Sequence, residues 1–217
     1  PPSAGKIPVY VGVADSGTVN APATFGRVKD LTAAFGGGPT VEAAARSIGV
    51  HGQPVCFIRA TTATAGAYVT SSIDVSGVTG TSVIAATGSA ANDDYEVVIL
   101  FITGGTRGTA GITYKYSLDG GRTYSPTQAL GTATSIVIPS SGSVTATLAA
   151  GTIVAGDVVT FRTVAPIWDT TGLTAALTAL QAWIGTWKDV RIVGDVNGAA
   201  FDAIETAMTT MDSAGKP

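Results

Sequence analysis

Histidine and cysteine, the residue types that most often carry catalysis or bind transition metals, each occur once in this sequence. Metal sites and nucleophile–base pairs usually need a positioned imidazole, so a single histidine, His51, removes most of these chemistries. We expect it to be exposed in a turn. Cys56 lies inside an apolar run, whereas a reactive thiol needs an accessible, electropositive setting. The sequence therefore predicts no enzyme activity, no catalytic residues and no bound cofactor.

Carboxylates offer one further kind of site, a calcium loop. Asp93, Asp94, Glu96 and Asp157 could supply oxygen ligands, but no Asp-x-Asp-x-Asp-Gly segment organises them. We therefore predict no metal site. Asp93 and Asp157 are expected to cap turns instead.

Two glycine clusters resemble phosphate-binding loops only weakly. Gly12 and Gly17 lack the Gly-Lys-Ser/Thr ending of a P-loop and the spacing of the dinucleotide motif. Gly36–Gly38 follows a predicted helix, whereas a phosphate cradle follows a strand. We interpret the second cluster as a hinge between two helices, and a nucleotide-binding α/β enzyme stays a minor alternative.

One motif combines residue types and spacing in a specific way. Its pattern is Ser-x-Asp-x-Gly-x-Thr-aromatic, formed by Ser117, Asp119, Gly121, Thr123 and Tyr124, and it resembles the Asp-box hairpin of sialidases and other propellers. Physically it predicts a tight turn in which the aspartate accepts backbone N–H groups and the glycines take positive φ. A propeller needs several copies and the sequence holds one. We therefore predict a stabilising turn, with a glycoside-hydrolysing module as the alternative.

Composition narrows the classes of partner. Only 12% of the 217 residues are charged, 45% are hydrophobic, and the net charge is −3 with no basic run. Electrostatic binding to the phosphate backbone of nucleic acid is therefore not expected. The longest apolar run, Val97–Ile102, is far short of the roughly 20 residues that cross a bilayer, so no membrane insertion is expected. A surface this poor in charge favours burial against other protein subunits.

The two ends of the chain give two further expectations. The segment Pro1–Ser3 has no charged region followed by an apolar one, so no secretory signal is expected. An opening without methionine and an ending at Pro217 indicate a piece of a longer protein.

The elements expected to form the first sheet lie in the first 60 residues. A β-branched run predicts a strand over Ile7–Val13, and apolar residues at helical spacing predict a helix from Thr24 to Phe35. A second helix is predicted over Thr40–Ile48, followed by a buried strand over Pro54–Ala60. This strand–helix–strand order predicts two parallel neighbouring strands.

From Tyr68 to Val164 the texture changes to short strands separated by Gly, Ser and Asp turns. In Ile112–Leu118 apolar and polar residues alternate, which is typical of a strand with one buried face. Several such strands predict a separate sandwich or barrel. The predicted strands are residues 72–78, 82–86, 95–103, 111–118, 135–138, 144–148 and 157–164.

Helical texture returns at Pro166. Asp169, Thr170 or Thr171 is expected to cap a helix whose apolar stripe packs on the sheet; the stripe consists of Leu173, Leu177, Leu180 and Ile184. A strand over Asp189–Gly194 and a helix capped by Asn197 follow, with Phe201, Ile204, Ala207, Met208 and Met211 on its buried face. The three tryptophans around these elements, Trp168, Trp183 and Trp187, are expected to pack in the core or against subunits.

These elements predict an α/β core layer interrupted by an all-β insertion domain. The core domain would comprise residues 1–66 and 166–217, incomplete at the C-terminus, and the insertion residues 67–165. After the last helix one more parallel strand is expected, yet none follows. The sheet edge is therefore predicted to be open, and an open edge promotes aggregation unless another segment or subunit covers it.

The order of these elements resembles that of contractile tail sheath subunits of bacteriophages and related injection machines. The resemblance is carried by Val9–Val13, by Phe25–Gly38, by the helix at Val41–Ala45, by Pro54–Arg59, by the insertion with Tyr116–Tyr124 and by the helix Leu173–Leu180 after it. Family members are generally longer and carry terminal arms that add strands to neighbouring subunits. The resemblance implies no catalytic residues.

The resemblance further implies a structural virion protein that polymerises around the tail tube and contracts for genome ejection. Its partners would be copies of itself and the tube protein, and its location the contractile tail of the virion, assembled in the host cytoplasm. A carbohydrate-binding or glycoside-hydrolysing module built on the insertion is the alternative.

Overall fold

The computed structural model describes residues 6–87, 91–138 and 144–215. It divides into two compact units, which we name the platform (residues 1–65 and 166–217) and the insert (residues 66–165). Within the described residues, no helix is long and apolar enough to cross a membrane.

The platform is built on a four-stranded sheet in the order β14-β1-β3-β2. Its strands are β1 (Ile7–Gly12), β2 (Ala23–Phe25), β3 (Val55–Arg59) and β14 (Trp187–Ile192). β1 is the central strand: it pairs in parallel with β3 on one side and with β14 on the other. The parallel neighbours predicted for the strand–helix–strand unit are confirmed. β14 and β2 are the two edge strands of this sheet.

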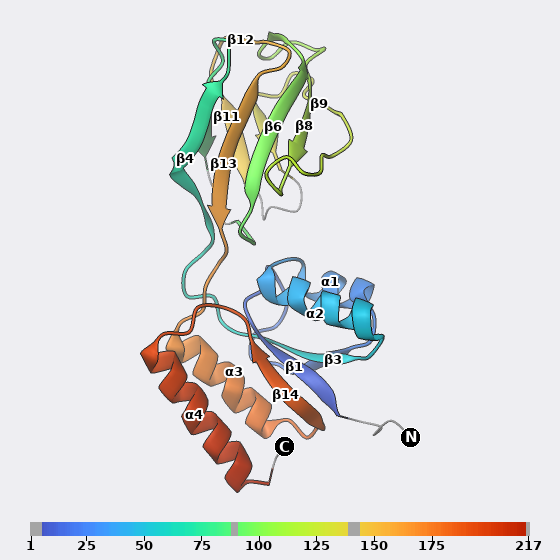
Figure 1. Cartoon of the computed structure of the whole chain (residues 1–217), viewed down its shortest axis with the longest axis vertical. Coiled ribbons are helices and arrows are strands. Elements are labelled where there is room, and N and C mark those ends of the chain that lie inside the picture. The colour runs from blue at the N-terminus through green and yellow to red at the C-terminus, as the bar shows by residue number, and fades with distance from the viewer. Residues whose placement is uncertain (1–5, 88–90, 139–143, 216–217) are drawn as a thin grey trace. The chain divides into compact units, whose positions relative to one another are not determined.

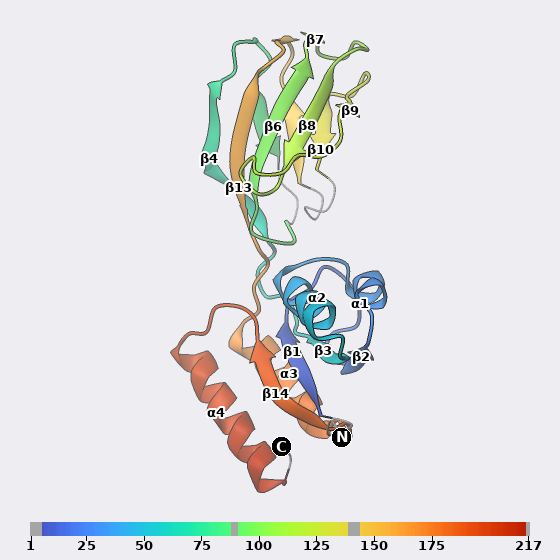
Figure 2. The same cartoon turned by 45° about the vertical axis from the view of Figure 1, so that its right-hand side comes forward.

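Helices cover both faces of the platform sheet (Figures 1 and 2): α1 (Val28–Phe35) and α2 (Pro39–His51) on one face, α3 (Thr170–Ala182) and α4 (Gly198–Ser213) on the other. Alternation along β1 explains the two layers, because Tyr10 faces α1 and α2 whereas Val9 and Val11 face α3 and α4. Each face therefore has its own apolar core.

The predicted helix start at Thr24 is wrong. Thr24 and Phe25 belong to β2, which pairs antiparallel with β3, and α1 begins only at Val28. The helical spacing of Phe25 with later residues is real, but pairing with the β3 edge satisfies its backbone groups instead. The Phe25 ring still reaches Phe35, with ring centroids 5.6 Å apart.

Asn197 caps α4 as predicted, and Asp169 is the one of the three candidate residues that caps α3. The Asp169 side chain accepts a hydrogen bond from the Gly172 amide at 2.8 Å, and Asn197 does the same for Ala200 at 2.9 Å. Two predicted core residues are wrong: Ile184 is 98% exposed because α3 ends at Ala182, and Phe201 is 61% exposed on the outer side of α4. The rest of each stripe packs against the platform core.

The insert consists of β-strands, with no helix among its described residues. A five-stranded sheet has the order β4-β13-β6-β8-β9, a three-stranded sheet the order β10-β11-β5, and β12 pairs with β7. The strands are β4 (Ala67–Gly77), β5 (Ile84–Thr87), β6 (Glu96–Thr103), β7 (Gly105–Thr106), β8 (Thr113–Ser117), β9 (Gln128–Ala129), β10 (Ser135–Val137), β11 (Thr145–Leu148), β12 (Thr152–Ile153) and β13 (Val158–Val164).

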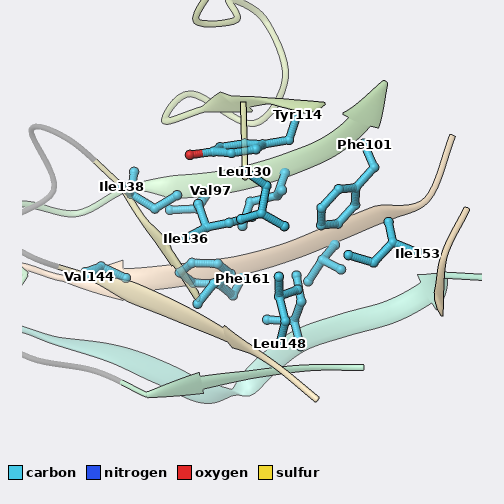
Figure 3. Close-up of a cluster of buried hydrophobic side chains, with 14 of the residues drawn as sticks. Val97, Phe101, Tyr114, Leu130, Ile136, Ile138, Val144, Leu148, Ile153 and Phe161 are labelled. Carbon is cyan, nitrogen blue, oxygen red and sulfur yellow. The ribbon is translucent and has the colours of Figure 1, made fainter. Parts of the chain in front are cut away.

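One apolar core fills the space between the two larger sheets of the insert (Figure 3). Phe101 and Phe161 enter it from the five-stranded sheet, while Ile136 and Leu148 enter from the three-stranded sheet. Every described sheet has open ends, so the arrangement is a sandwich and no closed barrel is present among these strands. The predicted fold class, a mixed α/β protein with a β-rich insertion, is confirmed.

Candidate functional site

The aspartate turn after β8 is held by hydrogen bonds among four residues between Ser117 and Thr123. Asp119 Oδ1 accepts from the Ser117 hydroxyl at 2.7 Å and from the Thr123 amide at 2.9 Å, and Oδ2 accepts from the Thr123 hydroxyl at 2.7 Å. The Gly121 amide donates to the Ser117 oxygen at 2.9 Å, and Gly121 has a φ of +91°. The Tyr124 hydroxyl lies near Gly121. Four of the five motif residues therefore bond to one another inside the turn, and Tyr124 lies beside them.

Hydrogen bonds also set the ionisation of Asp119. The Thr123 amide, then the Ser117 and Thr123 hydroxyls, hold its pKa well below the ordinary carboxyl value. The turn is therefore fully bonded above the unfolded-state pKa of about 4 and loses these bonds only as the pH falls through the lower folded-state value. At neutral pH Asp119 is a charged acceptor with a structural role.

Replacing Asp119 by Ala should loosen this turn without unfolding the insert. We expect the exchange rate of the Thr123 amide to rise roughly tenfold, because its acceptor is lost. Amide hydrogen exchange measures the effect. Thr127→Ala in the same loop, where the described structure shows no side-chain hydrogen bond, is the control. Equal exchange rates in the two variants would contradict a bonding role for Asp119.

The aspartate turn borders a groove on the insert, with a volume of about 820 Å³. Gly120 is part of its lining, and Glu96 and Arg162, paired on the neighbouring strands β6 and β13, form an ion pair at 3.3 Å in the lining. Asp74 and Thr160 add polar groups. No aromatic side chain other than Phe161, which is buried in the core, lines the described part of the groove. Such a lining can hydrogen-bond a hydroxyl-rich ligand but offers no stacking platform.

The remaining candidate residues are not gathered into a site. His51 is exposed, as predicted, but it is the last residue of α2 and not part of a turn, because the helix runs three residues past its predicted end at Ile48. Cys56 is fully buried, and burial raises the pKa of its thiol to about 12, so the thiol stays protonated. Among the described residues, no three His, Cys, Asp or Glu side chains lie together as a metal site would need.

The two aspartates expected at turns lie in the insert. Asp157 is buried and accepts hydrogen bonds from Thr79, Gly80 and Val154. Asp93 accepts from the Asp94 amide at 2.8 Å. Both therefore organise loops.

The tryptophans all lie in the platform. Trp168 and Trp187 are buried, Trp183 is half-buried, and all three pack in or against the core beneath α3 and α4. The Trp168 indole N–H donates to the Val193 carbonyl at 2.8 Å. They are core residues, and none of them is in the insert.

β14 is one of the two edge strands of the platform sheet, and β2 is the other. β14 pairs with β1 on one side, and no described strand pairs with its other side. Val190 and Ile192 are only half-buried although they point toward the α3 and α4 layer. An edge of this kind offers free backbone donors and acceptors to an added strand.

A second feature of the platform is a hollow of about 260 Å³ between α2 and β14. We name it the basic groove; its ionisable lining residues are Tyr10, Arg46, His51 and Arg191, with Ala43, Ser47 and Val50 beside them. Sequence analysis missed it, because Arg46 and Arg191 come together only through the strand order β14-β1. The one local signal was the spacing of Ala43, Arg46 and Val50 on one helical face.

Neither sequence comparison with known proteins finds a match. No protein-family model matches the chain, and no curated protein sequence matches it. Among solved structures, the sheath tail protein Lin1278 from Listeria innocua is similar, with a TM-score of 0.40 and 12% identity. The similarity covers 96% of this chain and 45% of that protein, so this chain spans less than half of its length.

Proposed function

We propose that this chain is a structural subunit of a contractile tail sheath. Copies would assemble through the platform around a tail tube, and the insert would be peripheral in the assembly. The observation that carries the proposal is the open edge at β14, which leaves one side of a four-stranded sheet without a described partner. A strand added by a neighbouring copy would satisfy that edge.

The chemistry of the chain supports the same role. Few charges, wide Ala and Thr helix surfaces and the element order that resembles sheath subunits all favour repeated contacts between copies. Contacts between two different surfaces of one molecule repeat head to tail, and they generate helical arrays unless the rotation closes them into rings. Contraction would then be a rigid-body rearrangement of subunits joined by added strands. We propose no catalytic step and no cofactor for this role, and the virion as its location.

Electron microscopy of the full-length protein tests the proposal. Tubes or rings are the expected result over a range of protein and salt concentrations. Monodisperse monomers under every condition would contradict it.

A second candidate function is favoured by the groove on the insert. A glycan could hydrogen-bond to Glu96, Arg162 and Asp74, which line it. A glycan array probed with the full-length protein tests this, with Arg162→Ala as the variant that should lose any signal. Tryptophan fluorescence is unsuitable, because no tryptophan lies in the insert. The sheath role alone predicts no glycan signal.

A further inference from the structure

Arg191 is held in position at the basic groove. One of its N–H groups donates to the Tyr10 hydroxyl at 2.7 Å, and its guanidinium carbon lies 5.4 Å from the centre of the Tyr10 ring. A second N–H group reaches Asp189 at 3.3 Å. Tyr10 is itself buried, so the Arg191 guanidinium is held against a side chain that is fixed in the core.

The two other basic side chains of the groove have no partner among the described residues. Arg46 and His51 are exposed on α2, and neither makes a hydrogen bond or an ion pair with the described residues. The lining contains no carboxylate, and Asp189 is the acid paired with this cluster. Two arginines and a histidine therefore face one acid. The hollow has room for one or two side chains of a partner.

A complementary surface lies on α4. Asp202, Glu205 and Asp212 are spaced so that they fall on one stripe of the helix, opposite the buried Ala207 and Met211. We name these three residues the acidic stripe. All three are exposed, none forms an ion pair with the described residues, and α4 contains no lysine or arginine.

The two surfaces cannot meet within one molecule. The basic groove lies on the face of the sheet that α1 and α2 cover, whereas α4 packs against the opposite face (Figures 1 and 2). Any pairing between them must therefore join two copies.

We infer that the acidic stripe of one copy docks at the basic groove of the next. The contact uses two different surfaces of the same chain, so it repeats from copy to copy and builds a helical assembly wherever the rotation does not close a ring. The carboxylates of Asp202 and Glu205 would pair with the basic side chains of the groove, which are Arg46, Arg191 and His51. This pairing would fix the register between two copies and raise the rate at which they associate. This inference rests on the proposed function, because it names the surfaces through which copies of the chain assemble.

Charge reversal in the full-length protein tests this pairing. The stripe variant carries Asp202→Lys and Glu205→Lys, and the groove variant carries Arg46→Glu and His51→Glu. Each alone should need a protein concentration about tenfold or more higher than the unaltered chain to assemble, because like charges would meet. Circular dichroism checks folding, which should be unchanged since the four side chains are exposed.

A control variant carries Arg27→Glu and Lys29→Glu, on exposed residues beside and within α1. It should assemble at the same protein concentration as the unaltered chain.

Mixing provides the decisive step. An equimolar mixture of the two variants should assemble again, because each altered surface then finds an oppositely charged one. A single chain that carries all four reversals should also assemble.

The outcomes separate the two hypotheses. Unaltered protein that assembles together with reversed variants that assemble equally well would overturn the pairing and leave the sheath role intact. Variants that fail alone and are not rescued by mixing would also overturn it, because the loss of assembly would then not come from charge pairing between the two surfaces. Unaltered protein that never assembles would overturn both.

Discussion

Replacing Leu173 by Ala should lower the free energy of unfolding of the platform by about 2–5 kcal/mol. Leu173 is fully buried on α3, in the core that α3 and α4 form against the sheet. Truncation removes apolar contacts and leaves a cavity that the surrounding strands cannot close.

Tryptophan fluorescence during urea unfolding measures this effect selectively. Trp168 and Trp187 are buried in the same core, and the insert has no tryptophan, so the signal reports the platform alone. Thr174→Ala, at the exposed neighbouring position, is the matched control and should change the stability by less than about 0.5 kcal/mol. Similar unfolding midpoints for the two variants would show that this layer is not a packed core.

Replacing Asp157 by Ala should destabilise the insert by about 3 kcal/mol. The buried carboxylate accepts from the Thr79 amide at 2.7 Å, the Thr79 hydroxyl at 2.8 Å, the Gly80 amide at 3.2 Å and the Val154 amide at 2.8 Å. Its loss leaves three backbone N–H groups without their acceptor, and each unpaired buried donor costs about 1–3 kcal/mol before water enters. Near-ultraviolet circular dichroism of tyrosine reports the insert, which holds five of the six tyrosines.

The same carboxylate makes the insert sensitive to acid. Burial alone would raise the pKa of Asp157, but the hydrogen bonds from Thr79, Val154 and Gly80 outweigh it, so its pKa lies below the ordinary value. The contribution of Asp157 to the free energy of unfolding of the insert is therefore complete above about pH 4, and it is lost as the pH falls through the folded-state pKa. In Asp157→Ala the stability of the insert should depend less on pH.

Asp74→Ala, which removes an exposed carboxylate, is the control and should leave the unfolding midpoint at neutral pH nearly unchanged. Equal losses of stability in the two variants would contradict the role of Asp157.

Local signals predicted the features of this fold that depend on a few neighbouring residues. The caps at Asp169 and Asn197 follow from side chains that bond amides three residues ahead. Long apolar runs predicted β1 and β3. The parallel pairing of these strands followed from the connection between them.

Features that depend on distant pairing could not be predicted. Thr24 and Phe25 form a strand only because β3 lies beside them, and strands of two residues, such as β7 and β12, are too short to show any periodicity. Phe201 looked buried by its spacing, yet the core beneath α4 is already filled by Ala200, Ala207 and Met211. The basic groove needed the strand order, which no local pattern contains.

Amide hydrogen exchange of the full-length protein, compared between dispersed and assembled samples, tests the central claim most directly. The claim is that copies join through the platform, with β14 as an edge that a neighbour completes. It predicts slower exchange on assembly at residues 187–192, at residues 43–51 and along α4, with the insert unchanged. Slower exchange confined to residues 66–165, with residues 187–192 exchanging as fast as in the dispersed protein, would contradict it.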